Sequence, residues 1–241
     1  MPRIHFFKYN NNKIAYRFSK RSKKTIVFIH GLQSDMNGTK ATFFYNIARR
    51  KKYSYLSMDL RGHGLSSGVF NQLSVKDWYQ DLNELIKFLK IKQIIIVGSS
   101  MGGWLAINYT LLNPSKIIKL IGLAPAPDFT ELLLWKNFSH SIKKKIMTKG
   151  VYKKRISKEF VYEYSKALIM QSRPMLTNKI KSKYNGKAIF FQGSKDTSVP
   201  YDYNNRFLDG DNFENLQIII VKDADHSLSD TKTLKIIEKE F

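Results

Sequence analysis

Residues 93–103 read Gln-Ile-Ile-Ile-Val-Gly-Ser-Ser-Met-Gly-Gly, and this stretch decides the fold. Its apolar run, residues 94–97, is short and rich in β-branched side chains, which predicts a buried strand. A helix-forming run begins at Trp104, so a serine-containing turn with small neighbours joins a strand directly to a helix. Glycines around such a turn let the backbone bend sharply, and a turn of this kind can present a reactive hydroxyl at the edge of a sheet.

Strands and helices alternate outward from this turn along most of the chain. The alternation predicts an α/β fold with a mostly parallel central sheet flanked by helices, because parallel strands are joined by crossover helices. Three asparagines, residues 10–12, separate the first two strands and predict an opening antiparallel hairpin. The predicted strands are 4–7, 14–18, 25–29, 53–58, 93–97, 117–123, 188–191 and 217–221. The predicted helices are 39–50, a helix that Ser74 caps and that runs to about residue 90, 104–112 and 231–241.

The length of 241 residues favours one domain, residues 1–241. Between about residues 126 and 183 the alternation stops, and the pattern becomes helical and rich in Leu, Tyr, Phe and Met. We therefore expect a helical insertion that covers the sheet as a lid. Residues 136–158 of this insertion contain nine Lys or Arg and no Asp or Glu.

Composition excludes several classes of protein. The chain contains no cysteine, which rules out disulfides, thiolate-bound metals and a thiol nucleophile. Its net charge of +22 could serve nucleic acid or an anionic surface, but 32 of the 41 basic residues are lysines spread along the whole chain, which fits a compositional bias as well. No apolar run approaches the roughly 18 residues of a membrane span, and the N-terminus resembles no targeting segment, so we expect a cytoplasmic protein.

Two segments match Gly-x-Ser-x-Gly, residues 64–68 and 98–102. Only the second follows a predicted strand and leads into a predicted helix, which is the context that a nucleophile requires. We therefore predict Ser100 as the nucleophile and Ser66 as a loop serine.

Backbone N–H groups near Ser100 could stabilise a negatively charged oxygen. The helix that follows the turn begins with free N–H groups, and Met101 is the best-placed donor. A second donor should come from the loop after strand 25–29, where we predict the N–H of Leu32. His30, in the same loop, is expected to bond only its own loop. His63 is expected in a structural turn where Arg61 and Asp59 can pair.

The general base and its acidic partner should follow the nucleophile in the order acid, then histidine. His226 lies just after the last predicted strand and is the predicted base, whereas His140 lies in the basic insertion. Asp196 follows strand 188–191 and is the predicted acid. Asp128, one strand earlier, stays open as an alternative, and Asp225 is too close in sequence to His226 to face its ring.

These motifs together resemble the α/β-hydrolase superfamily of serine hydrolases over nearly the whole chain. A closer resemblance, to the abhydrolase domain-containing protein 10 family, rests on residues 36–41, 98–105 and 147–151. That resemblance implies a palmitoyl-protein thioesterase that also hydrolyses the acyl-glucuronide of mycophenolic acid, with Ser100, Asp196 and His226 as its triad. Animal members are mitochondrial, which would place a processed form in the matrix. The superfamily motifs are His30-Gly31-Leu32, residues 59–66, residues 98–103, Asp196 with Val199-Pro200, and Asp225-His226.

The expected activity is hydrolysis of acyl thioesters or esters through an acyl-enzyme, without metal or organic cofactor. The substrate would be a small acyl ester or thioester or an S-acylated protein. One alternative is a general carboxylesterase or lipase without thioester preference. A remote one is a nucleic-acid-binding protein on a hydrolase scaffold, although no aromatic–basic recognition motif is present. The candidate acyl-pocket residues in the insertion are Leu132, Trp135, Phe138, Tyr162 and Met170.

Overall fold

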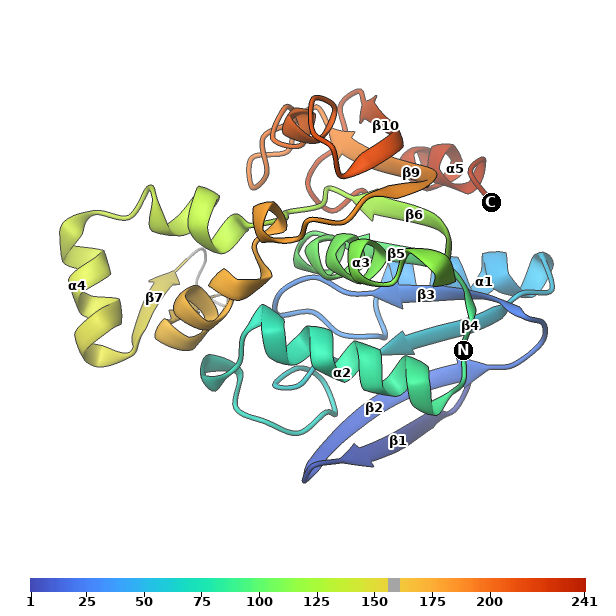
Figure 1. Ribbon diagram of the computed structural model, residues 1–241, viewed down its shortest axis with the longest axis horizontal. Coiled ribbons are helices and arrows are strands. Elements are labelled where there is room, and N and C mark those ends of the chain that lie inside the picture. Colours follow the sequence, from blue (N-terminus) through green and yellow to red (C-terminus); the bar gives the residue numbers. More distant parts are fainter. Residues whose placement is uncertain (156–160) are drawn as a thin grey trace.

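A computed structural model describes residues 1–155 and 161–241, and its centre is an eight-stranded sheet (Figure 1). The strand order is β1-β2-β4-β3-β5-β6-β9-β10. In this order, each neighbouring pair from β4 through β3, β5, β6 and β9 to β10 is parallel, whereas β2 is antiparallel to both of its neighbours. The predicted opening hairpin and mostly parallel sheet are confirmed. The strands are β1 Ile4–Tyr9, β2 Asn12–Ser19, β3 Lys24–Ile29, β4 Ser54–Met58, β5 Gln93–Ser99, β6 Ile117–Leu123, β9 Tyr184–Gly193 and β10 Phe213–Val221.

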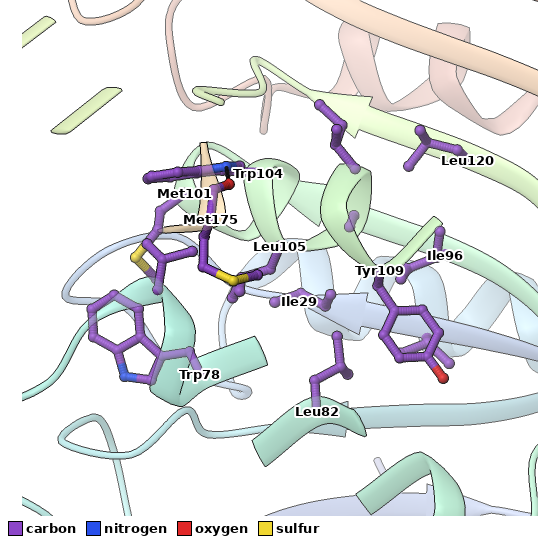
Figure 2. Close-up of a cluster of buried hydrophobic side chains, with 14 of the residues drawn as sticks. Ile29, Trp78, Leu82, Ile96, Met101, Trp104, Leu105, Tyr109, Leu120 and Met175 are labelled. Carbon is purple, nitrogen blue, oxygen red and sulfur yellow. Dashed lines mark hydrogen bonds between the residues drawn. The ribbon is translucent and has the colours of Figure 1, made fainter. Parts of the chain in front are cut away.

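Helices cover both faces of this sheet (Figure 1). Because successive side chains of a strand point to opposite faces, Ile94 and Ile96 of β5 pack beneath α2 and α3, while Ile95 and Val97 pack beneath α1 and α5. Figure 2 shows the first of these layers, in which Trp78 of α2 lies near Met101 of α3. The helices are α1 Thr39–Arg50, α2 Val75–Phe88, α3 Met101–Leu112, α4 His140–Lys149 and α5 Thr231–Glu238.

Two helix starts illustrate how the sequence sets the element boundaries. The main-chain N–H and the hydroxyl of Ser74 both donate to the Asp77 carboxylate at the start of α2, so the predicted cap is confirmed. The start of α3 was predicted three residues too late. Gly102 and Gly103 are weak helix formers, but close packing of this segment against neighbouring chain holds it in the helix.

The segment between β6 and β9 is not helical throughout, which corrects the expectation for residues 126–183. Besides α4 it contains an antiparallel pair, β7 Val151–Arg155 and β8 Val161–Ser165. Gly150, with φ +80°, ends α4, and the aromatic and β-branched residues that follow favour strands. The other short helical segments of the described chain are the 3₁₀ turns η1 Phe70–Gln72, η2 Pro114–Lys116, η5 Arg173–Met175, η6 Thr177–Lys179 and η7 Asn205–Phe207, and the π-helical segments η3 Thr130–Trp135 and η4 Ala167–Gln171.

Arg61 does not pair with Asp59, which corrects a second expectation. Its guanidinium donates to Asp81 of α2 at 2.8 Å, and the fully buried Asp81 carboxylate also accepts the hydroxyl of Tyr9 in the opening hairpin. The Asp59 carboxylate instead accepts the N–H groups of Met36 at 2.8 Å and Leu65 at 2.9 Å. The arginine therefore ties α2 to the hairpin, while the aspartate closes its own loop.

Among the described residues, no helix has both the length and the apolar surface that crossing a bilayer would require.

The pair of Arg61 and Asp81 provides a test of the core. Asp81→Ala should lower the free energy of unfolding by about 3 kcal/mol, because it removes the nearer carboxylate partner of the mostly buried Arg61 guanidinium and leaves only Asp77, at 3.5 Å. Glu84→Ala removes the partner of Lys87 on the exposed side of the same helix and should cost below about 1 kcal/mol. Urea denaturation of the two variants measures both values. Equal losses would show that the buried pair carries no special share of the stability.

Candidate active site

Ser100 lies on a strained turn between β5 and α3. Its backbone has φ +54° and ψ −118°, a conformation that side-chain-bearing residues rarely adopt. Hydrogen bonds hold the turn from both sides: the Ser100 N–H donates to Leu123 O at 2.9 Å, and the Ser100 carbonyl accepts the N–H groups of Gly103 at 2.8 Å and Ala126 at 3.1 Å. The strained residue is therefore fixed by its own helix and by the end of β6.

The flanking glycines are required by close contacts between backbones. A Cβ on Gly98 would overlap the carbonyl group of Gly102, and a Cβ on Gly102 would overlap the carbonyl oxygens of Ile29 and His30. Ser66, in the second Gly-x-Ser-x-Gly segment, has a different environment. Its hydroxyl donates to Asp59 O at 2.6 Å and accepts the Ala15 N–H at 2.9 Å, so it closes a loop.

The structure brings Ser100, His226 and Asp196 together from three separate segments. His226 Nε2 lies 3.0 Å from Ser100 Oγ, and His226 Nδ1 lies 2.7 Å from Asp196 Oδ2. The Asp196 side chain is fully buried, while 29% of the His226 side chain is exposed. Hydroxyl, imidazole and carboxylate thus form one hydrogen-bonded row that solvent can reach at the imidazole.

The surroundings of Asp196 favour its charged form. Burial raises the pKa of this carboxyl group, but hydrogen bonds from His226 and from the N–H groups of Val199 and Ser198 outweigh burial, so its pKa lies below the ordinary value. Gln192 also donates its side-chain amide to Asp196 at 2.8 Å. A carboxylate bonded in this way can accept the N–H of an imidazole and fix its orientation.

The alternative acids are engaged elsewhere. Asp128 accepts the backbone N–H of Thr177 at 2.8 Å and also its hydroxyl, and it lies 3.3 Å from the Arg206 guanidinium. Asp225 accepts the N–H and hydroxyl of Ser227. His140 lies at the exposed start of α4. Among the described acids, Asp196 is the one that meets His226.

Two backbone N–H groups next to Ser100 are available as donors. Met101 is the first residue of α3, and Gly31, which precedes Leu32, lies so close to Ser100 that an added Cβ would be 3.4 Å from the Ser100 Cβ. Within the part of the chain that the structure describes, neither the Leu32 nor the Met101 N–H donates to another protein group. Their use by a substrate oxygen stays a prediction.

Sequence reasoning missed two residues that hold the acid and base loops. Gln192, fully buried at the end of β9, donates its amide to Asp196 and to Val199 O. Lys40 of α1 donates to the Ser227 carbonyl, directly after His226. Burial lowers the pKa of Lys40 to about 8, although the negative charge of Asp225 acts to raise it. The position of Gln192 after a strand could have identified it, whereas nothing local identifies Lys40.

The insertion residues predicted for an acyl pocket fall into two groups. Phe138 and Tyr162 join an aromatic cluster with Tyr164, with ring centroids 5.6 Å apart for Phe138 and Tyr164 and 5.9 Å apart for Tyr162 and Tyr164. Both residues pack against the main core. The others, Leu132, Trp135 and Met170, are partly exposed, and Trp135 lies beneath Lys143 and Arg173.

His30 and His63 form a buried pair under the loop that carries Leu32, with ring centroids 5.1 Å apart. His30 bonds Gly31 O at 2.8 Å in its own loop, but its Nε2 also accepts the Leu60 N–H, so the expectation that it bonds only its own loop is wrong. His63 Nε2 accepts the Gln33 N–H at 3.0 Å. Burial lowers the pKa of each imidazole to about 4, so both are neutral near pH 7 and have structural roles.

No group of three or more potential metal-ligating side chains gathers within residues 1–155 and 161–241.

The chain resembles known proteins in sequence and in fold. A family model described as serine aminopeptidase, S33, matches residues 20–184. The chain is 29% identical over 233 residues to the mitochondrial palmitoyl-protein thioesterase ABHD10 of Bos taurus, a match that covers 93% of this chain and 74% of that protein. Two solved structures superpose with TM-scores of 0.89 at 23% identity: a putative hydrolase from Agrobacterium vitis S4, covering 99% of this chain and 97% of that one, and α/β-hydrolase domain-containing protein 10 from mouse, covering 99% and 96%. The predicted α/β-hydrolase fold is thereby confirmed.

The neutral histidine pair predicts a loss of stability in acid. Between pH 6.5 and 4 the unfolded chain protonates these imidazoles while the folded chain does not, so the free energy of unfolding falls as the pH is lowered through this range. In His63→Gln, whose amide oxygen can still accept the Gln33 N–H, the fall should be smaller by up to about 1 kcal/mol per pH unit. Urea denaturation at several pH values measures it. Identical pH dependence in both proteins would contradict a neutral His63.

Proposed function

We propose that this chain, which belongs to the serine aminopeptidase S33 family, hydrolyses acyl thioesters or esters through a covalent acyl-enzyme. One observation carries the proposal: His226 bridges the Ser100 hydroxyl and the Asp196 carboxylate within hydrogen-bond distance. This order of groups allows an imidazole to remove a serine proton and return it to a leaving group. The strained turn at Ser100 supports the same assignment, because strain of this kind concentrates at reactive residues.

The first half of the reaction forms the acyl-enzyme. His226 Nε2 accepts the Ser100 proton as Oγ attacks the acyl carbonyl carbon, and the carbonyl oxygen becomes negatively charged. The N–H groups of Leu32 and Met101 donate to this oxygen. The intermediate then expels the leaving sulfur or oxygen, which takes the proton from His226, and the acyl group remains on Ser100.

The second half releases the acid by the same groups. A water molecule gives one proton to His226 while its oxygen attacks the acyl carbon, and the bond to Ser100 Oγ breaks as the proton returns to Oγ. Asp196 accepts a hydrogen bond from the Nδ1–H group throughout, which keeps Nε2 free as an acceptor and stabilises the imidazolium. The low pKa of Asp196 keeps it charged for this task.

The likeness to ABHD10 of Bos taurus, which is named a palmitoyl-protein thioesterase, supports a thioester substrate. We assign the insertion between β6 and β9 as a lid on a single domain, with Leu132, Trp135 and Met170 as candidate acyl contacts. Phe138 and Tyr162 would shape this lid from within, since they pack in its aromatic cluster. A small acyl thioester and an S-acylated protein both fit this reaction.

Replacing the nucleophile tests the proposal. Ser100→Ala should reduce kcat for p-nitrophenyl butyrate by roughly 10⁴–10⁶-fold and abolish labelling by a fluorophosphonate, because the three groups act as a unit. Ser66→Ala, in the second Gly-x-Ser-x-Gly segment, is the matched control and should keep most of the activity per folded molecule. Near-normal hydrolysis by Ser100→Ala would refute the assignment.

The acid provides a second test. Asp196→Asn should lower kcat by about 10⁴-fold with little change in the fold, because an amide can hold His226 in the wrong tautomer. Asp225→Asn changes the carboxylate next to His226 and should leave kcat within a few-fold of the parent. Steady-state kinetics with near-ultraviolet circular dichroism as the folding control measures both. A small loss in Asp196→Asn would return the role to another acid.

The leaving group separates the proposal from the alternative of a general carboxylesterase. The kcat/KM values for a palmitoyl thioester, the matched oxygen ester and an aminoacyl amide should rank in that order. Equal values for the thioester and the ester, after correction for their non-enzymatic hydrolysis, would favour the carboxylesterase.

A further inference from the structure

The insertion carries a higher density of positive charge than the rest of the chain. Residues 126–183 contain 14 Lys or Arg and four Asp or Glu, a net charge of +10, whereas an even spread of the total +22 would give about +5. Compositional bias adds lysine everywhere, so it does not account for this excess.

Eight cations gather on α4, β7 and the turn before α4, and we call this set the basic face. Seven of them are exposed, and Lys143 is half-buried over the Trp135 ring. Within the described part of the insertion, one carboxylate, that of Glu163, pairs with the set through Lys153. The members of the basic face are Lys136, Lys143, Lys144, Lys145, Lys149, Lys153, Lys154 and Arg155.

An apolar side chain is exposed among these cations. Ile146 points from α4 into the protein and is fully buried, while Met147 is 43% exposed. Lys144 and Lys143 lie three and four residues before Met147, so the three side chains are neighbours on the helix surface. Lysines beside an exposed apolar side chain match the boundary of an anionic bilayer, where ammonium groups meet phosphates and the apolar group enters the headgroup region.

The basic face lies at an outer end of the molecule. Figure 1 shows α4 and β7 at one end of the longest axis, on the side of the sheet where the parallel strands end. Ser100 follows one of these strands, β5, and so lies at the same edge of the sheet. A flat surface can therefore approach α4 without first meeting the sheet.

We propose that the basic face docks this protein on an anionic phospholipid surface. The consequence for substrate, which rests on the proposed function, is that acyl groups at the bilayer meet the same end of the molecule as Ser100. Single-stranded nucleic acid fits less well, because it requires open aromatic rings for stacking. The rings next to the basic face, Trp135 and Tyr152, are already covered by Lys143 and Lys145.

Vesicle flotation with the full chain tests the proposal. Binding is measured to phosphatidylcholine vesicles and to vesicles with 30% phosphatidylserine, at about 0.05 and 0.15 M salt. The test variant carries Gln at Lys144, Lys149, Lys154 and Arg155, and the matched control carries Gln at Lys20, Lys23, Lys51 and Lys92, four exposed lysines outside the insertion. Because each basic residue near an anionic membrane contributes to affinity, the test variant should bind anionic vesicles at least roughly tenfold more weakly, and the control by less than about threefold.

Each outcome decides the proposal. It is supported by binding that requires phosphatidylserine, weakens with salt and is lost in the test variant alone. Equal binding to neutral vesicles, an equal loss in the control, or no binding by the parent would overturn it, as would tighter binding of a DNA probe through the same four residues. Hydrolysis of p-nitrophenyl butyrate should be unchanged in both variants. Vesicle binding does not use Ser100, so activity remaining in Ser100→Ala would refute the proposed function and leave this result standing.

Discussion

The strained backbone of Ser100 is the constraint on which the rest of the site depends. Strand β5 ends and helix α3 begins on either side of Ser100, and this abrupt change of direction holds the Ser100 backbone at φ +54°. The two segments can approach so closely because Gly98 and Gly102 have no side chains to collide. The strain is sustained by hydrogen bonds on both sides of the residue and by the buried layer in which Met101 packs. Each of these neighbours helps to hold the Ser100 hydroxyl in one position, where the His226 imidazole can bond it.

The partners of Ser100 are held by the parallel sheet. Pairing of β6, β9 and β10 brings the loops after β9 and β10 to the same edge, so Asp196 and His226 meet although 30 residues separate them. The two loops pack tightly: a Cβ on Gly193 would overlap the carbonyls of Ala224 and Asp225. Gln192 secures the acid loop from beneath and Lys40 secures the base loop from α1. The geometry of the row is thus a property of the sheet and its anchors.

Much of this arrangement could be predicted from the sequence, because its signals are local. Strand and helix patterns, the capped start of α2 and the context that separates Ser100 from Ser66 each lie within about ten residues. The errors arose where distant chain decides. Arg61 pairs with Asp81 of a later helix, and the strands β7 and β8 form only by pairing with each other. The open choice between Asp128 and Asp196 also needed the fold, since both follow strands that end at the same edge.

The insertion contacts the site through Ala126 and Met175, near its two ends, whereas α4 in its middle has few contacts with the sheet. Ala126 donates to the Ser100 carbonyl, and the Met175 carbonyl accepts the Trp104 and Asn108 side chains of α3. Moving these ends would disturb the strained turn directly. By contrast, α4 packs chiefly on β7, and a side-chain bond from Gln33 to Val161 O ties β8 to the loop that carries Leu32. Sequence change in α4 and β7 can therefore alter what approaches the molecule while the row of Ser100, His226 and Asp196 stays in place.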